Sequence, residues 1–550
     1  MRHAAASVLL IVAALTTLVR SAYCLDGGTL RVIPRNGWSA FEVISIGENP
    51  ADDGFNWAMP GTFDGLGAWL PDAATLRVLV NHETGDATVS EVNLNLGNFL
   101  TAIENTIAGG ATGGVSFVNS ARQAYGRWSD DGGATWIDTV DVTNTSFIRF
   151  CSGQSYQPNA FGAGRSFVDD IYITGEEFGN DRLFAIDLAN RDFYRLSGTA
   201  GSASGGIGGM PFDSWENAAL LDTGETNHVA LLLSPDGGTQ IMKLYIGEKG
   251  KDASGNASNS FLARNGLAYG SYYYLNDALP VSGTSTDGFF DTTTTGALAS
   301  SKLEDIDANP NDPVQVVLGD EDSGLFTLDF QLDFSSGSFN AAASSFAITK
   351  IQQHNNDVDG LFGDADNVDW SAATTLNGVT YPDGLIFVNE DSGTANGETW
   401  MMKPDGTGLT LIADTAGIAS ATETSGVLDI SNLVGYKPGS VLLTSNQGSS
   451  ASLTVLINPH AALAGDFNGD GTVDAADYVV WRKNPDAFGG QQGYDEWRAN
   501  FSRTVGSGAS AGVDSSGNLA GVPEPAGACL ATLGGLAVLL YRFRSHAAAH

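Results

Sequence analysis

Short apolar runs separated by turn-forming residues occupy most of the chain from Leu25 to about residue 462. Examples are Leu183 to Leu188, Val229 to Leu233 and Leu325 to Phe330, and almost no long stretch has the 3.6-residue apolar period of a helix. The 69 glycines suit many tight turns. This pattern is typical of an all-β protein, and about 435 residues are too many for one sandwich but suit a propeller. We therefore predict an all-β propeller of six or seven blades over residues 25–462.

Four of the apolar runs end directly in acidic residues. Side chains at strand ends project into the loops along one rim of a β-scaffold, where functional residues commonly lie. Repeated acidic strand ends are therefore expected to converge on a polyanionic site that binds metal ions. The alternative interpretation is that they are solvated turn acids. The four ends are Asn81-His82-Glu83, Gly175-Glu176-Glu177, Asp320-Glu321-Asp322 and Asn389-Glu390-Asp391.

The charge balance of the chain is strongly acidic. It has 63 Asp and Glu residues against 26 Lys and Arg residues, a formal net charge of −37. Such a charge repels nucleic acids and anionic lipids and attracts divalent cations. We therefore exclude a nucleic-acid partner. Most of these acids also fit the acidic surface of a soluble extracellular protein, which would need no active site.

The beginning of the chain has the features of a secretory signal. Met1-Arg2-His3 supplies a charged start, and the stretch from Ala4 to Val19 supplies a short apolar core. This pattern predicts a signal peptide over residues 1–24 and export of the protein.

The end of the chain also has the features of a targeting segment. Val522-Pro523-Glu524-Pro525 precedes an apolar stretch and the basic end Tyr541-Arg542-Phe543-Arg544. This arrangement over residues 522–550 resembles the PEP-CTERM sorting tail. The resemblance implies contact with sorting machinery, removal of the tail, and a protein that is secreted or attached to the cell surface or outer envelope. A plain membrane anchor is the alternative, although about 15 apolar residues are short for a bilayer span.

Cysteine usage gives no disulfide framework. Cys24 and Cys529 fall in the two targeting segments, so the mature chain would keep Cys151 alone. Residues 504–521 are rich in Gly, Ser and Ala, which predicts a flexible linker.

One turn motif supports the propeller. The segment from Ser129 to Trp136 matches the Asp-box pattern Ser-x-Asp-x-Gly-x-Thr-Trp, a hairpin turn that recurs in sialidase-like propellers. The resemblance implies a structural role for Asp131 and Trp136. A sialidase would also need an arginine cluster, and this domain has few arginines to supply one.

A twelve-residue calcium loop follows the predicted propeller. Oxygen-bearing side chains occupy five of its ligand positions, the carbonyl of Thr472 fills another, and Gly471 stands where the sharp turn needs it. The loop and the helix-like Tyr478 to Lys483 resemble a type I dockerin repeat, which predicts a helical calcium module over residues 463–503. A second full loop is missing before the helix-like segment from Tyr494 to Phe501, which argues against cohesin binding. The predicted calcium ligands are Asp466, Asn468, Asp470, Thr472, Asp474 and Asp477.

Several enzyme classes lack their motifs. No His-x-His or His-Glu-x-x-His spacing of a zinc hydrolase occurs, and there is no Walker loop or dinucleotide fingerprint. The Gly-x-Ser-x-Gly match at Gly508 to Gly512 lies in the linker without a preceding strand, so it is not a nucleophile elbow. Oxygen-rich metal chemistry remains, in which hard cations bind a phosphate and polarise a water.

The order of several short motifs resembles the PhoX-type alkaline phosphatases. That resemblance implies an exported β-propeller that hydrolyses phosphate monoesters with iron and calcium ions in its central channel. The motifs span about 300 residues, and their shared order carries the resemblance. They are Asn81-His82-Glu83, Arg127-Trp128, Thr174-Gly175-Glu176-Glu177, Trp215-Glu216-Asn217, Lys243-Leu244-Tyr245, Leu303-Glu304-Asp305-Ile306 and Tyr381-Pro382-Asp383-Gly384.

Carried over residue by residue, the resemblance implies four metal ligands in the propeller: Glu176, Glu177, Glu216 and Glu304. Gly175 stands where that family has its metal-binding cysteine. Without that thiolate, the soft ligand suited to iron is lost, and a calcium-only or inactive site follows. Cys151 would replace it only if the fold returned it to the site, which the sequence does not predict. No arginine can be assigned to the phosphate, and Arg165 is the weakest candidate.

Three functions stay open at this point. The first is an exported metal-dependent phosphoric-monoester hydrolase that uses calcium and, as a further candidate, iron. The second is a calcium-stabilised, non-catalytic surface propeller that binds polysaccharide or an envelope protein. The third, a secreted glycan-cleaving enzyme, would need a pair of carboxylates at hydrolase separation in a groove.

Overall fold

The computed structural model describes residues 30–505 except for several short internal segments. These segments are 51–56, 110–111, 140–146, 178–181, 197–212, 237–239, 282, 301, 356–357, 393–395 and 419–422. The predicted signal peptide, the sorting tail and nearly all of the predicted linker lie outside the described residues.

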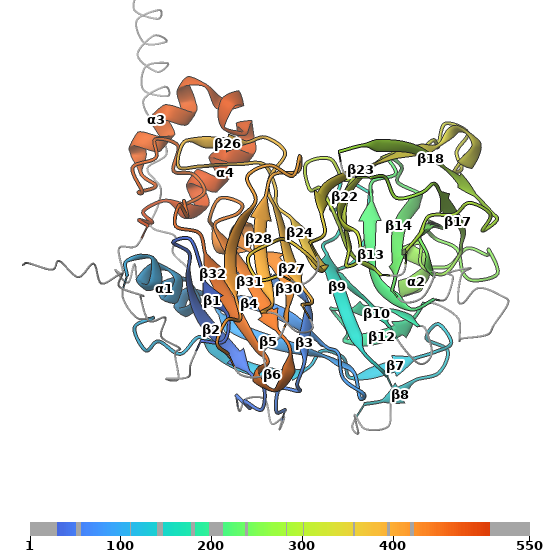
Figure 1. The fold of residues 1–550 in the computed structure, drawn as a ribbon, viewed down its shortest axis with the longest axis horizontal. Helices are drawn as coiled ribbons and strands as arrows, with labels where there is room; N and C mark the ends of the chain where they lie inside the picture. Colours follow the sequence, from blue (N-terminus) through green and yellow to red (C-terminus); the bar gives the residue numbers. More distant parts are fainter. Residues whose placement is uncertain are drawn as a thin grey trace, which may run out of the picture.

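The described strands form a six-bladed β-propeller, in agreement with the predicted all-β class (Figure 1). The first three blades come from the amino-terminal half of the chain. Blade 1 contains β3 (Phe63–Asp72), β4 (Thr75–His82), β5 (Thr88–Asn95) and β6 (Val118–Gln123). Blade 2 contains β9 (Phe150–Tyr156), β10 (Ile171–Glu176), β11 (Leu183–Asp187) and β12 (Asp192–Arg195), extended by β7 (Arg127–Ser129) and β8 (Ile137–Asp138). Blade 3 contains β13 (Trp215–Leu221), β14 (His228–Pro235), β16 (Lys243–Glu248) and β17 (Gly270–Asn276).

The other three blades complete the ring. Blade 4 contains β20 (Leu303–Ala308), β21 (Gln315–Asp320), β22 (Gly324–Gln331) and β23 (Ser345–Gln353), and β18 (Ser285–Asp291) joins it to blade 3. Blade 5 contains β24 (Ala365–Trp370), β27 (Ile386–Glu390), β28 (Glu398–Met402) and β29 (Thr410–Asp414), extended by β1 (Ile33–Pro34). Blade 6 contains β30 (Thr424–Asp429), β31 (Val441–Asn446), β32 (Ser452–Ile457) and β2 (Ser39–Ser45).

The remaining elements are short. Two small two-stranded sheets pair β15 (Gln240–Ile241) with β19 (Ala299–Ser300) and β25 (Thr374–Leu376) with β26 (Val379–Tyr381), and the second of these is a hairpin. The α-helices are α1 (Leu96–Ile107), α2 (Phe261–Arg264), α3 (Ala475–Lys483) and α4 (Gly490–Asn500). The 3-10 helices are η3 (Ala341–Ala343), η4 (Ser431–Val434), η5 (Gly448–Ser450) and η6 (Pro485–Phe488). Across the described residues, no helix combines the length and apolarity that crossing a membrane requires.

The ring closes through a strand from each end of the described chain. Strand β2 pairs antiparallel with β32, with Ser39 opposite Ile457 and Ser45 opposite Ser452. The amino-terminal strand therefore becomes the outer strand of the last blade, which protects an edge that would otherwise be exposed. Apolar clusters fill the spaces between adjacent blades, such as the Trp69, Phe147 and Phe184 cluster between blades 1 and 2.

The inner strands of all six blades contact one another around the central channel, and each contains a β-bulge near its beginning. In β3, for example, Phe63 pairs with His82 and Leu66 pairs with Val80, so Asp64 and Gly65 together face one residue of β4. Register shifts occur at the same level in the other five inner strands. A bulge turns successive side chains away from strict alternation and is common beside active sites. These bulges position the polar residues of the channel.

The predicted Asp-box turn is present and is held by side-chain hydrogen bonds. Asp131 accepts a hydrogen bond from the Thr135 amide at 2.8 Å and from Ser129 Oγ at 2.8 Å. Trp136 packs edge-on against Tyr194 of β12. The motif therefore has a structural role here, as the sequence predicts.

The helices α3 and α4 pack against the side of the propeller that carries α1 and the β25–β26 hairpin (Figure 1). Val473 and Trp497 belong to the same apolar cluster as Val434 and Tyr436 of the propeller. Lys437 Nζ donates to the carbonyl of Asp466 at 2.9 Å. The predicted small helical module is therefore present after the last blade, and it shares a core with the blade.

Candidate metal centre

Within the described residues, two sets of potential metal ligands converge at the bulged ends of the inner strands. The first set, which we call the carboxylate group, is Glu216, Glu304 and Asp366, from blades 3, 4 and 5. The second set, the thiol group, is Asp64, Glu83 and Cys151, from blades 1 and 2. In each set one ligand atom per residue lies within 4.8 Å of the others.

The carboxylate group is buried and brings three acidic side chains close together. Burial, followed by repulsion from neighbouring carboxylates, raises the pKa of Glu216 and Asp366 well above the usual range. Burial raises the pKa of Glu304 in the same way, although Lys302 Nζ at 3.2 Å opposes that rise. Buried carboxylates in this arrangement are stable when protonated or when a cation binds between them. Three hard oxygen donors suit calcium.

The thiol group combines a soft ligand with two hard ones. Burial and the surrounding carboxylates raise the pKa of the Cys151 thiol, and its Sγ donates to Glu177 Oε2 at 3.2 Å. Asp64 accepts hydrogen bonds from Ser425 Oγ at 2.7 Å and Gln447 Nε2 at 2.9 Å. A metal ion would deprotonate this thiol, and a thiolate beside carboxylates suits a first-row transition metal better than calcium.

Two of the four predicted propeller ligands, Glu216 and Glu304, lie together in the carboxylate group. Glu177 lies beside the thiol group, where burial raises its pKa to about 7. Glu176 is in neither group, because its carboxylate accepts two hydrogen bonds from Arg182, at 2.6 and 2.7 Å. The structure thus gives Glu176 a buried ion pair instead of an open ligand position.

Gly175 has no room for a side chain. A Cβ atom built there would lie 2.3 Å from the carbonyl oxygen of Trp215. The bulge in β9 instead places Cys151 and Ser152 opposite Gly175 of β10. Cys151, on the adjacent inner strand, therefore lies opposite the position at which the sequence resemblance expects a thiol.

Sequence reasoning missed Asp64, Cys151 and Asp366 as members of these groups. The acidic strand ends that the sequence singles out follow the second strand of a blade. Most residues of the two ligand groups instead lie near the beginning of the inner strand. A signal for them exists, because a polar residue followed by a second polar residue or a glycine interrupts an otherwise apolar strand at several bulges. The clearest cases are Phe63-Asp64-Gly65-Leu66, Trp215-Glu216-Asn217-Ala218, Leu303-Glu304-Asp305-Ile306 and Ala365-Asp366-Asn367-Val368.

The other acidic strand ends lie around the same rim. Glu321 Oε2 contacts Lys302 Nζ at 2.8 Å, and Glu390 accepts a hydrogen bond from the Gly363 amide at 2.7 Å. Burial raises the pKa of Glu83, and repulsion from the neighbouring Asp391 adds to that rise. The acidic strand ends therefore do lie along one rim. The carboxylates after β21 and β27 surround the two ligand groups but are not members of them.

Two further candidates have other roles. His82 is buried, its ring nitrogens contact Gly61 O and Ser90 Oγ, and burial lowers its pKa to about 4. It is therefore neutral near pH 7. Arg165 forms an ion pair with Asp222 at 2.8 Å, so it does not contact the metal-ligand groups.

A second acidic layer lies deeper in the channel. Burial raises the pKa of both Asp305 and Asp307 to about 7. A cavity of about 20 Å³ opens beside Asp305, Asp369, Gln154 and Asn217. Such a volume holds about one water molecule.

This layer predicts that stability falls as pH rises. In the unfolded chain these aspartates have a pKa near 4, so between about pH 4 and 7 the folded state binds more protons. The free energy of unfolding then decreases by about 1.4 kcal/mol per pH unit for each such group. Urea unfolding of chelator-treated protein at pH 5 and pH 7.5 would measure this decrease. Asp307→Asn should make the dependence shallower, and stability that rises with pH would contradict the prediction.

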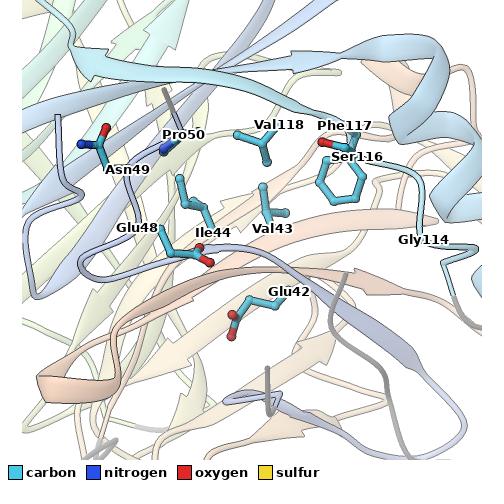
Figure 2. Close-up of a pocket in the computed structure, with 10 residues that line it drawn as sticks. All are labelled: Glu42, Val43, Ile44, Glu48, Asn49, Pro50, Gly114, Ser116, Phe117 and Val118. Atoms are coloured by element: carbon cyan, nitrogen blue, oxygen red, sulfur yellow. The ribbon is translucent and has the colours of Figure 1, made fainter. Parts of the chain in front are cut away.

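A larger cavity of about 460 Å³ lies between β2 and β6, at the outer edges of blades 6 and 1 (Figure 2). Figure 2 shows Val43, Ile44 and Val118 together in its middle, with Glu48 beside them. Glu48 accepts a hydrogen bond from the Ser45 amide at 2.7 Å. The cavity is largely apolar and contains none of the ligand groups.

The predicted calcium loop forms a tight turn with inward carboxylates. Asp466 accepts hydrogen bonds from the Gly469 and Gly471 amides at 2.8 and 2.9 Å, and both glycines have positive φ. Asp477 is fully buried and accepts hydrogen bonds from three loop amides, including that of Asp474 at 2.8 Å. Residues 502–505 pair with 471–473, which ties the end of the module to the loop.

The arrangement of blades matches a solved structure, although no protein-family model and no curated protein matches this sequence. Pseudomonas fluorescens PhoX, in complex with vanadate, a transition state analogue, aligns with a TM-score of 0.51 and 12% identity. The match covers 78% of this chain and 96% of that chain. The chain has a PhoX-like fold. Chaetomium thermophilum Sqt1 aligns with a TM-score of 0.33 and 10% identity, over 76% of this chain and 99% of that chain.

The Glu176–Arg182 pair allows a test that separates structural acids from ligands. Glu176→Gln leaves the buried Arg182 charge without its partner, which should cost about 3–5 kcal/mol of folding free energy. Metal content should not change. Urea unfolding and metal analysis would measure both effects. Asp192→Asn is the control, because its partner Arg127 is 44% exposed and solvent screens that pair, so the loss of stability should be much smaller. Loss of metal without loss of stability would return Glu176 to the ligand set.

Proposed function

We propose that this protein is an exported, metal-dependent phosphoric-monoester hydrolase. The observation that carries the proposal is the convergence of two buried ligand groups, one with a thiol, at the bulged ends of the inner strands of a PhoX-like propeller. So many buried carboxylates are costly without cations. Metal binding would remove that cost and assemble a centre able to bind phosphate.

The donor sets support different metals at the two groups. We assign calcium to Glu216, Glu304 and Asp366, since all three ligands are hard oxygens. We assign iron to Asp64, Glu83 and Cys151, because a thiolate favours a transition metal. Bound metals would neutralise the phosphate and lower the pKa of a water for in-line attack.

Two cationic side chains at the rim would orient the phosphate. Arg149 is 46% exposed and contacts Glu83 at 3.1 Å and Glu177 at 3.2 Å. Lys302 is 33% exposed and contacts Asp236 and Glu304 at 3.3 and 3.2 Å. Each therefore lies beside one ligand group while a part of its surface stays accessible to a bound anion. These residues replace Arg165 as the proposed phosphate contacts.

The proposal is tested by metal analysis combined with an assay of the full chain. Purified protein, loaded with calcium and ferrous or ferric iron, should release the chromophore from a chromogenic phosphate monoester. Chelator-treated protein should not. Bound metal without turnover would reject the hydrolase and favour a calcium-stabilised propeller that binds polysaccharide or an envelope protein. A propeller without bound metal would reject both site assignments.

We also propose that the loop from Asp466 to Asp477 binds calcium. At free calcium about 100 times the dissociation constant, binding should stabilise the folded protein by about 2.7 kcal/mol. Asp477→Asn should remove this calcium-dependent part, and Asp486→Asn, an exposed acid outside the loop, should keep it. Thermal unfolding with and without calcium would measure the difference. Terbium luminescence excited through Trp497, whose Nε1 donates to the Asp474 carbonyl at 2.7 Å, would report occupancy. Equal calcium effects in both variants would contradict the assignment.

A further inference from the structure

The two ligand groups are joined by a continuous chain of buried hydrogen bonds. On the side of the carboxylate group, Ser152 donates to Glu216 Oε1 from its Oγ at 2.6 Å and from its backbone amide at 3.1 Å. On the side of the thiol group, Ser425 Oγ donates to Asp64 Oδ1 at 2.7 Å. Asn367 lies between the two serines and contacts both.

The backbone fixes the orientation of the Asn367 side chain. The Gly426 amide donates to Asn367 Oδ1 at 2.6 Å, so this atom must be the carbonyl oxygen. Asn367 Nδ2 therefore faces Ser152 and donates to its Oγ at 2.7 Å. Since the Ser152 oxygen accepts that hydrogen, its own hydroxyl hydrogen is directed at Glu216.

The second serine connects Asn367 to the other group. Ser425 Oγ lies 2.8 Å from Asn367 Oδ1 as well as 2.7 Å from Asp64 Oδ1. Its single hydroxyl hydrogen is shared between these two acceptors. Asn367 and Ser152 are 1% exposed and Ser425 is fully buried, so bulk water does not reach these contacts, although Asn367 borders the cavity of about 20 Å³. In such surroundings, hydrogen-bonded groups polarise one another.

We propose that Asn367 is a positioning residue shared by both metal groups, a role that rests on the proposed metal centre. It would contact no metal and no substrate. By setting the direction of the Ser152 hydroxyl it holds Glu216, and by accepting from Ser425 it holds that serine beside Asp64. Partners of this kind typically change metal affinity by about 10- to 100-fold when they are removed.

The test measures metal binding by the full-length protein and does not depend on activity. Equilibrium dialysis with Ca²⁺ alone would report the carboxylate group. Titration with Co²⁺ alone would report the thiol group through its thiolate charge-transfer absorption. Asn367→Leu should weaken both affinities by about 10-fold or more. Asn265→Leu is the matched control, since Asn265 is equally buried but accepts from the Val168 amide and donates to Asp169, away from this chain of hydrogen bonds. Weakening at both groups by Asn367→Leu alone supports the proposal, and any other pattern among these variants overturns it.

A charge-adding variant tests the direction of the hydrogen bonds and provides an alternative if Asn367→Leu fails to fold. Asn367→Asp keeps the acceptor for Gly426 but replaces the donor to Ser152 by an oxygen, which draws the Ser152 hydroxyl away from Glu216. A general effect of the added negative charge would strengthen calcium binding. Weaker calcium binding therefore supports the proposal, and unchanged or stronger binding overturns it.

A double-mutant cycle separates the positioning role from simple packing. Ser152→Ala removes the donor to Glu216 directly, so its effect on calcium affinity should not add to that of Asn367→Asp. Additive effects of the two substitutions on calcium affinity would contradict a shared chain of hydrogen bonds. Wild-type protein that binds neither metal would instead reject the proposed metal centre itself.

Discussion

Glu216→Gln is expected to abolish metal-dependent hydrolysis of a chromogenic phosphate ester, lowering kcat/KM by at least about 100-fold. Glu216 begins the inner strand of blade 3, is 2% exposed, and lies in the carboxylate group with Glu304 and Asp366. Its neutral amide analogue has almost the same shape but offers calcium no anionic oxygen. The loss should therefore come from metal binding and not from unfolding.

The measurement combines calcium content, unfolding and kinetics. Calcium bound to the propeller should fall together with kcat/KM in Glu216→Gln. Glu42→Gln is a suitable control. Glu42 is also 2% exposed, but it lies on β2, an outer strand, and forms an ion pair with Arg31. The control should keep both calcium and turnover. Full activity in Glu216→Gln with wild-type calcium content would reject the assigned centre.

Cys151→Ser is expected to have the second large effect, the loss of iron from the thiol group with calcium retained at the carboxylate group. The thiol is the only soft ligand among the six converging residues. An alcohol has nearly the same shape, but it deprotonates far less readily and binds iron more weakly. Hydrolysis should fall by at least about 100-fold if iron takes part in the reaction.

A second substitution at position 151 tests whether the metal preference depends on the negative charge of the ligand or on its sulfur atom. Cys151→Asp supplies an anionic oxygen, so it should restore divalent binding at the thiol group with a preference for calcium over iron. Metal analysis after loading with equal amounts of both metals would measure that preference. Iron content equal to wild type in Cys151→Ser would show that the thiol is not a ligand. Turnover without iron would leave a calcium-only hydrolase as the explanation.

The acidic strand ends show how far local patterns predict a site. Glu177 and Glu390 follow apolar runs at the ends of second strands, and the structure does place such ends along one rim. The direct ligand groups nevertheless come mostly from the beginnings of inner strands, as with Asp64 and Asp366. There a bulge breaks the strict alternation of side chains, so the sequence pattern does not predict the direction of these residues.

Gly175 shows what a residue-by-residue resemblance leaves out. The sequence places a glycine at the expected cysteine position and Cys151 24 positions earlier. In the sheet those two positions face each other, because β9 and β10 pair antiparallel across the bulge. Only the pairing of the two strands therefore shows that a thiol lies opposite Gly175.

The sequence by itself determined the all-β class, the turn-rich blades, the Asp-box hairpin and the helices after the last blade. These features depend on local alternation, glycine conformations and short motifs, which are readable within a few residues. Only the tertiary structure decided which side chains meet. Asp64 and Ser425 are 361 positions apart and yet form a 2.7 Å hydrogen bond. Ring closure and six aligned bulges create that contact, since long-range strand pairing and not local preference sets where each inner strand begins.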